Sequence, residues 1–228
     1  MPMKAAGSTA LREIDRFEGG VGWIAYPDET MERASHALAT DDGVWLVDPV
    51  DADGLDDLIA EFGGVAGVAV CLDRHKRDAA AIAARHDVAV HIPEWMTGVE
   101  SKLDATVKRF GDQLGETGYR TFVVRDSSVP PWQEAGLYNP DTGTLVVPES
   151  VGTASYFVTD TEQLGVHPML RLFPPKRALE SYAPERILVG HGDGIHENAS
   201  RILRDALDGS RGRTPALYGK TLKSLITR

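Results

Sequence analysis

Residues 44–49 read Val-Trp-Leu-Val-Asp-Pro, an apolar run that ends in an acidic residue and a proline. Four apolar residues bounded by turn-forming residues are typical of a buried strand. Asp-Asp-Gly at 41–43 predicts a tight turn just before this strand. Segments 22–26 and 35–40 also have the apolar content of strands, so the chain is predicted to open with a β-meander.

Helices and strands are predicted to alternate after this proline. Apolar residues recur at helical spacing over 55–62, and two glycines separate this helix from an apolar strand at 65–72. An alanine-rich helix is predicted at 78–85 and a further strand at 88–92. This strand-helix-strand-helix-strand order favours parallel strands joined by right-handed crossovers.

A second cluster of strands is predicted in the second half of the chain. A polar helix at 99–114 precedes a strand at 119–125. Residues 139–143 suit the turn of a hairpin between strands at 135–138 and 144–147. The remaining predicted elements are a helix at 176–182, a strand at 186–189 and a helix at 197–207.

The two clusters of strands are not separated by a linker rich in glycine, serine or proline. We therefore expect a single domain over residues 1–228, in which two sheets pack together with helices outside. A length of 228 residues and a hydrophobic content of 42% are enough for a substantial core. The tail from about residue 210 is interpreted as a solvated terminal helix rather than a partner site. Its cations are Arg211, Arg213, Lys220, Lys223 and Arg228.

Charge and cysteine content argue against several classes of protein. Acidic residues outnumber basic ones by 34 to 24, and a net charge of -10 disfavours a nucleic-acid partner. Cys71 is the one cysteine, so we expect no internal disulfide and a small core side chain. We expect a cytoplasmic protein without a membrane partner, because long apolar spans and a signal-peptide pattern are missing from the sequence. Its acidic, lysine-poor composition suggests a salt-adapted cytoplasm, which unfolding in low and molar salt would test.

Three short motifs follow predicted strands in a fixed order: Asp-Pro at 48–49, Asp-Arg-His-Lys-Arg-Asp at 73–78, and Gly-His-Gly at 190–192. Together they resemble the metallo-β-lactamase superfamily, in which an Asp-Pro strand end precedes a metal-binding His-x-His-x-Asp-His loop and a later Gly-His-Gly loop. The resemblance covers roughly 22–207, and Pro-Glu at 148–149 stands where the family usually has Gly-Asp. It implies an α/β fold, a four-layer αββα sandwich of two mixed β-sheets, with a site for one or two metal ions at one edge.

The polar cluster keeps little of the family's ligand loop. Aligned without a gap, it matches the family's histidines at His75 alone, whereas Asp73 and Asp78 stand at the other histidine positions. Arg77 takes the place of the aspartate that is both ligand and general base. A guanidinium is always protonated and cannot bind a cation, so Arg77 argues against a second metal ion.

Two further residues match the family's ligands. Glu149 takes the position of the bridging aspartate, and His191 that of the final histidine. With His75 and Asp73, they form a set for a single Zn²⁺ or Fe²⁺ ion at most. Asp78 would act as a fourth ligand or base. This arrangement predicts a mononuclear hydrolase of an ester, thioester or phosphoester, and it is the alternative hypothesis.

The hypothesis that the sequence favours is metal-free. Arg74, Lys76 and Arg77 place three positive charges beside the loop. Each costs a bound cation about 2 to 4 kcal/mol at separations of roughly 4 to 8 Å and an effective dielectric of about 20. The arginines would instead form a network with the carboxylates. The protein would then be a binding or scaffold protein, whose arginine-rich cavity is either collapsed or takes a small molecule or a small anion.

Asp48 and most of the other histidines are interpreted as structural residues rather than as metal ligands. The resemblance implies that Asp48 orients the ligand loop from beneath. His36 and His91 are interpreted as structural residues, and His196 as a residue near a helix start. His167 precedes Pro168 and could reach an opening of the site, so its role stays open.

Overall fold

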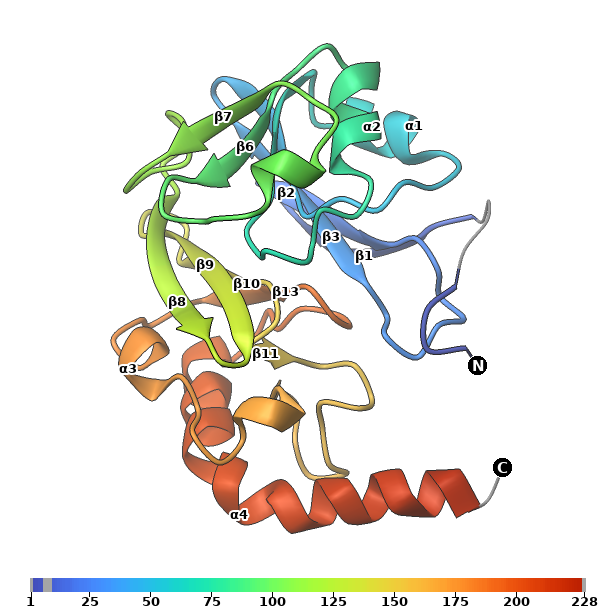
Figure 1. The fold of residues 1–228 in the computed structure, drawn as a ribbon, viewed down its shortest axis with the longest axis vertical. Coiled ribbons are helices and arrows are strands. Elements are labelled where there is room, and N and C mark those ends of the chain that lie inside the picture. The colour runs from blue at the N-terminus through green and yellow to red at the C-terminus, as the bar shows by residue number, and fades with distance from the viewer. Residues whose placement is uncertain (1, 6–9, 227–228) are drawn as a thin grey trace.

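The computed structural model describes residues 2–5 and 10–226, and it places two β-sheets between layers of helices (Figure 1). The seven-stranded sheet has the strand order β1 (Arg12–Phe17), β2 (Gly20–Ile24), β3 (Ala34–Thr40), β4 (Gly43–Val47), β5 (Val65–Ala69), β6 (Val90–Pro93) and β7 (Val107–Phe110). The four-stranded sheet has the order β13 (Arg186–Val189), β10 (Thr144–Val147), β9 (Pro131–Asn139) and β8 (Arg120–Ser128). The other elements are β11 (Val151–Gly152), β12 (Gly165–Val166), α1 (Leu55–Ala60), α2 (Ala79–Arg85), α3 (Lys176–Leu179), α4 (Ala199–Ile226) and the 3₁₀ turns η1 (Glu100–Lys102) and η2 (Pro168–Leu170).

The first sheet combines the predicted meander with the predicted parallel strands. Strands β1 to β4 pair antiparallel, and β4 to β7 pair parallel. Residues 44–47 alternate between its two faces, as expected for a strand buried on both sides. Val44 and Leu46 pack in the core that includes α1 and α2, whereas Trp45 and Val47 pack toward the second sheet.

The second sheet contains the predicted hairpin and one parallel pair. Strands β9 and β10 pair antiparallel around the turn, and β10 pairs in parallel with β13. Leu145 and Ile187 face the core that includes α4, and Val146 and Leu188 face the first sheet. The core between the sheets separates the two helical layers, so the expected αββα sandwich is confirmed.

Several predicted elements need correction. The polar helix expected at 99–114 is wrong, because β7 forms there after η1. Pairing with β6 outweighs the weak helical pattern of this segment. The last predicted helix continues to Ile226 with Pro215 inside it, so the basic tail belongs to α4 as far as that residue. Arg228 lies outside the described residues.

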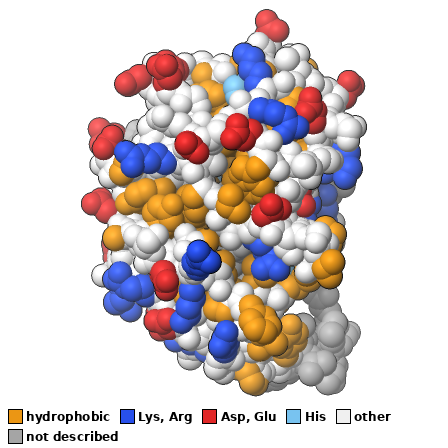
Figure 2. All heavy atoms as spheres, turned by 60° about the vertical axis from the view of Figure 1, so that its left-hand side comes forward, with side chains coloured by type: hydrophobic (Ala, Val, Ile, Leu, Met, Phe, Trp, Pro, Cys, Tyr) orange, Lys and Arg blue, Asp and Glu red, His pale blue; other side chains and the backbone are white. Residues whose placement is uncertain are grey.

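Cys71 lies in the core between the sheets, as predicted, and burial raises the pKa of its thiol well above the usual value. Among the described residues, no helix is long and apolar enough to cross a membrane. On the face drawn in Figure 2, acidic and basic side chains are interspersed rather than separated.

Candidate metal centre

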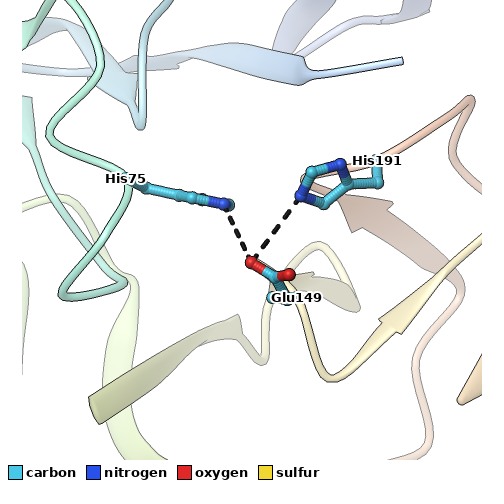
Figure 3. Close-up of side chains that lie close together, drawn as sticks. All are labelled: His75, Glu149 and His191. Carbon is cyan, nitrogen blue, oxygen red and sulfur yellow. Dashed lines mark ion pairs between the residues drawn. The ribbon is translucent and has the colours of Figure 1, made fainter. Parts of the chain in front are cut away.

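Three loops bring His75, Glu149 and His191 together at one edge of the sheets (Figure 3). His75 follows β5, Glu149 follows β10, and His191 follows β13. Because β10 and β13 are parallel and in register through their last residues, the segments after them start side by side. Within the part of the chain that the structure describes, this is the one group of three or more potential ligands whose ligand atoms all lie within 4.8 Å of one another.

The three side chains converge on one carboxylate oxygen. Glu149 Oε2 lies 3.1 Å from His75 Nε2 and 3.7 Å from His191 Nε2. All three side chains are buried, and His191 is 0% exposed. The sequence-based set of His75, Glu149 and His191 therefore meets in space.

Nδ1 of His75 contacts Asp48, the residue that the resemblance assigned to orienting the ligand loop. His75 Nδ1 lies 3.0 Å from Asp48 Oδ2, and Asp48 Oδ1 accepts a hydrogen bond from the Cys71 amide at 2.8 Å. A carboxylate only accepts hydrogen bonds, so the ring proton of His75 sits on Nδ1. Nε2 of His75 points toward Glu149 and would offer a lone pair there when the ring carries this one proton.

His191 is oriented in the same way by a backbone carbonyl. Its Nδ1 lies 2.8 Å from the Met31 oxygen, which can only accept a hydrogen bond. Its buried Nε2 has no hydrogen-bond partner among the described residues. Burial lowers the pKa of His191, which keeps the ring neutral and leaves a free lone pair on Nε2.

These contacts give the centre the chemistry of a metal site. Burial raises the pKa of Glu149, but the close approach of His191 and His75 outweighs this and holds it well below the usual range. This lowering of the pKa depends on positive charge beside the carboxylate, which a proton on an imidazole or a bound cation would supply. Without either, Glu149 Oε2 and the two Nε2 atoms would be three acceptors that repel one another. Two imidazoles and a carboxylate are a donor set for one Zn²⁺ or Fe²⁺ ion.

His167 reaches the same carboxylate, but with the opposite tautomer. Its Nδ1 accepts a hydrogen bond from the Met169 amide at 3.2 Å. Burial lowers the pKa of His167 to about 4, so the ring is neutral at pH 7 and its proton sits on Nε2. Nε2 lies 3.4 Å from Glu149 Oε1 and can donate to it. The sequence offered only Pro168 as a signal for this loop.

Glu134 on β9 binds the backbone segment that carries Glu149. The sequence analysis did not identify this residue. This carboxylate is fully buried and accepts hydrogen bonds from the Glu149 and Ser150 amides, both at 2.8 Å. It also accepts from Trp132 Nε1 at 2.8 Å and from the Ser150 hydroxyl. These donors fix the backbone that carries Glu149.

Arg77 lies beside the centre and is bonded to backbone oxygens. Its guanidinium donates to the carbonyls of Ala34, Asp48 and Gly190 at 2.5, 2.8 and 3.0 Å. Nη2 also lies 3.4 Å from His75 Nε2. Arg77 therefore holds a positive charge beside the centre and is tied to three backbone segments.

The structure does not bring Asp73 and Asp78 into the centre. Asp78 precedes α2, and its carboxylate accepts a hydrogen bond from the Asp51 amide at 2.9 Å. Asp73 accepts from the Gln133 amide at 3.3 Å and contacts Arg74. Because the chain turns into α2 here, the roles expected for Asp73 as a ligand and for Asp78 as a ligand or base find no support in their positions.

Glycines on both sides of His191 are required by close packing. A Cβ atom on Gly190 would lie 2.1 Å from the Pro148 carbonyl oxygen. Gly192 has a φ of +88°, and a Cβ atom there would lie 2.2 Å from Thr153 Oγ1. The Gly-His-Gly motif thus lets the loop pass close to the segments that carry Glu149.

Comparison with known proteins identifies the fold but no close relative. No protein-family model and no curated protein matches the sequence. The structure is similar to DIM-1 metallo-β-lactamase exposed to ceftazidime, with a TM-score of 0.60 and 12% identity over 90% of this chain and 100% of that one. It is similar to a metallo-β-lactamase from Pontibacter korlensis, with a TM-score of 0.61 and 12% identity over 87% of this chain and 99% of that one. The flavodiiron protein from Giardia intestinalis has a TM-score of 0.61 and 14% identity over 91% of this chain and 61% of its own. The chain therefore has the metallo-β-lactamase fold that its sequence motifs predicted.

Proposed function

We propose that the protein is a metal-dependent hydrolase that holds a single ion between His75, Glu149 and His191. The observation that carries this proposal is the convergence of three acceptor atoms within 4.8 Å, one of which, His191 Nε2, is buried without a hydrogen-bond partner among the described residues. A bound ion would act as a Lewis acid and lower the pKa of water toward neutrality. The expected substrate is an ester, a thioester or a phosphoester.

The residues around the three ligands would prepare them for the ion. Asp48 and the Met31 carbonyl hold the two rings with their lone pairs toward Glu149. His167 would donate to the other carboxylate oxygen, which leaves Oε2 facing the rings. Arg77 restricts the centre to one ion, because its charge and its bulk exclude a second.

Metal analysis of protein purified without chelator tests this proposal. We expect about one equivalent of zinc or iron per chain, and a strong loss in His191→Gln and Glu149→Gln. His86→Gln is the matched control, because His86 pairs with Asp56 near the surface, away from the centre. Less than about a tenth of an equivalent in the wild-type protein would contradict the proposal. The identity of the metal also matters, since zinc has no redox chemistry and iron does.

The metal-free scaffold that the sequence favoured is the second candidate. It is supported by Arg77, whose guanidinium ties three backbone segments together and lies 3.4 Å from His75 Nε2. Thermal unfolding with and without chelator separates the two candidates. A hydrolase with a bound ion should lose several degrees of melting temperature on chelation, on the order of 5 °C, whereas a metal-free scaffold should not change.

A further inference from the structure

Arg74 lies at the more exposed side of the candidate metal centre. Its Nε is 3.4 Å from Glu149 Oε2, and its side chain is 38% exposed, against 8% for Glu149. The guanidinium carbon lies 4.0 Å from the centre of the Trp132 ring. Trp132 is buried and bonded to Glu134, so this ring is a fixed support. One face of the guanidinium thus rests on a rigid aromatic surface while the group still reaches solvent.

The donors of Arg74 are only weakly used by the protein. Among the described residues, its hydrogen bonding is limited to one long contact, from Nη1 to Asp73 Oδ1 at 3.5 Å. Its ion pair with Glu149 is also long, at 3.4 Å. An ion held by Glu149 would neutralise that carboxylate and weaken its attraction for Arg74. A planar guanidinium with free donors is suited to bind the oxygens of a carboxylate or phosphate.

The charge around the centre also favours an anion. Three cations and four carboxylates lie in or beside it: Arg74, Lys76, Arg77, Asp48, Asp73, Glu134 and Glu149. The four carboxylates exceed the three cations by one formal charge, so a divalent ion would still make the centre positive. In a chain with a net charge of -10, this centre would then attract anions locally.

We infer that the centre takes a substrate with an oxyanion group, either carboxylate or phosphate, and that Arg74 is the residue that binds this group. This inference rests on the proposed function for the reaction that follows binding. It assigns substrate recognition to a side chain that contacts the carboxylate ligand from the solvent side and is not itself a metal ligand.

Calorimetric titration of the full chain, purified without chelator, with inorganic phosphate and separately with acetate tests this inference. We expect one or both probes to bind, and the probe that binds more tightly indicates a tetrahedral or a planar anionic group. Arg74→Met should weaken binding about tenfold or more, because a charge-assisted hydrogen bond is lost. Arg74→Lys should retain part of the affinity, since the charge remains without the planar donors.

Arg125→Met is the matched control for Arg74→Met. Arg125 approaches the same Trp132 ring, at 5.9 Å, from β8, and the described contacts of Glu149 do not include it. We expect this variant to bind phosphate and acetate as the wild-type protein does. Circular dichroism of each variant shows that the comparison is made between folded proteins.

Two results would overturn the inference: no binding of either anion to the wild-type protein, or equal binding by wild type and Arg74→Met. Metal content measured on the same samples distinguishes this failure from that of the proposed function. Loss of anion binding in Arg74→Met without any bound metal would refute the single-ion hydrolase but support the anion site. One equivalent of metal, with anion binding that does not depend on Arg74, would support the single-ion hydrolase but refute the anion site.

Discussion

At the residue scale, the ring nitrogen that carries the proton decides whether a histidine of the centre can bind a metal through Nε2. His75 and His191 can do so, whereas neutral His167 cannot. His75 and His191 donate through Nδ1 to Asp48 and to the Met31 carbonyl, so with a single ring proton their Nε2 atoms face Glu149 as acceptors. His167 accepts through Nδ1, so its Nε2 faces Glu149 as a donor. Histidine therefore has two roles around Glu149, as an acceptor or as a donor through Nε2. The hydrogen-bond partner of Nδ1 decides which role each ring has.

Asp48→Asn should reverse this arrangement at His75. The new amide can still accept from the Cys71 backbone, and asparagine tolerates the positive φ of +48° at this position. Its amino group would donate to His75 Nδ1 and move the ring proton to Nε2, where it blocks an ion. We expect metal affinity to fall about 10- to 100-fold, measured by competition with a chelator.

The control for Asp48→Asn is Asp193→Asn, since Asp193 is exposed and pairs with Arg12 on the surface. Nitrogen NMR of the imidazoles should show the change of tautomer at His75 in the Asp48 variant alone. An unchanged affinity in Asp48→Asn, with the proton still on Nδ1, would refute this account of the site.

At the scale of elements, two parallel strands determine where the ligands meet. Pairs in β10 and β13 run from Thr144 with Arg186 to Val147 with Val189. The chain then continues as Pro-Glu after one strand and as Gly-His after the other, which places a carboxylate and an imidazole at the same sheet edge. The Gly190 amide donates to the Val147 carbonyl at 3.3 Å, which joins the two segments, and the absence of a side chain on Gly190 permits this approach.

Gly190→Ala should therefore destabilise the protein and disturb the centre. The added methyl group would lie 2.1 Å from a backbone oxygen, which cannot move as a flexible side chain would. We expect a loss of about 1 to 3 kcal/mol in the free energy of unfolding, measured in urea. Gly64→Ala is the matched control, because its Cβ atom would meet nothing within 4 Å; a change within about 0.5 kcal/mol is expected there. Equal stabilities of the two variants would contradict the packing argument.

At the scale of the whole molecule, Asp15 links the first strand to the last loop. Its Oδ1 accepts from the Gly194 amide at 2.7 Å and lies 2.8 Å from His196 Nε2. Its Oδ2 lies 3.2 Å from His36 Nε2. Burial raises the pKa of Asp15, but His196 and His36 outweigh it and hold the pKa well below the usual range. A buried carboxylate thus joins residues 181 positions apart.

The stability contributed by Asp15 should depend on pH. Because its folded pKa lies below its unfolded value of about 4, the stabilisation is complete above that value and is lost as the pH falls through the folded pKa. Asp15→Asn should cost about 2 kcal/mol at pH 7, and the difference from wild type should shrink below about pH 4. Urea unfolding at pH 7 and pH 3 measures this. Asp160→Asn, at a side chain that is 91% exposed, should change little at either pH. A difference that grows toward pH 3 would show the sign to be wrong.

Prediction from sequence succeeded where local signals agreed with the tertiary contacts. The turn at 139–143 and the alternation after residue 49 gave the hairpin and the parallel strands correctly. It failed at 99–114, where pairing with β6 decided the conformation. It also placed the end of the last helix too early. Ser210 and Leu217 are buried in α4, so packing extends this helix past glycines that favour an end.

The sequence by itself determined which side chains are able to bind a cation and that Arg77 is not among them, because these properties belong to the functional groups. It also determined the fold, through the order of its motifs. Only the tertiary structure decided that His75, Glu149 and His191 meet while Asp73 and Asp78 do not. Distances between loops depend on strand register and sheet packing, and the position of a ring proton depends on a carbonyl or carboxylate far away in the chain.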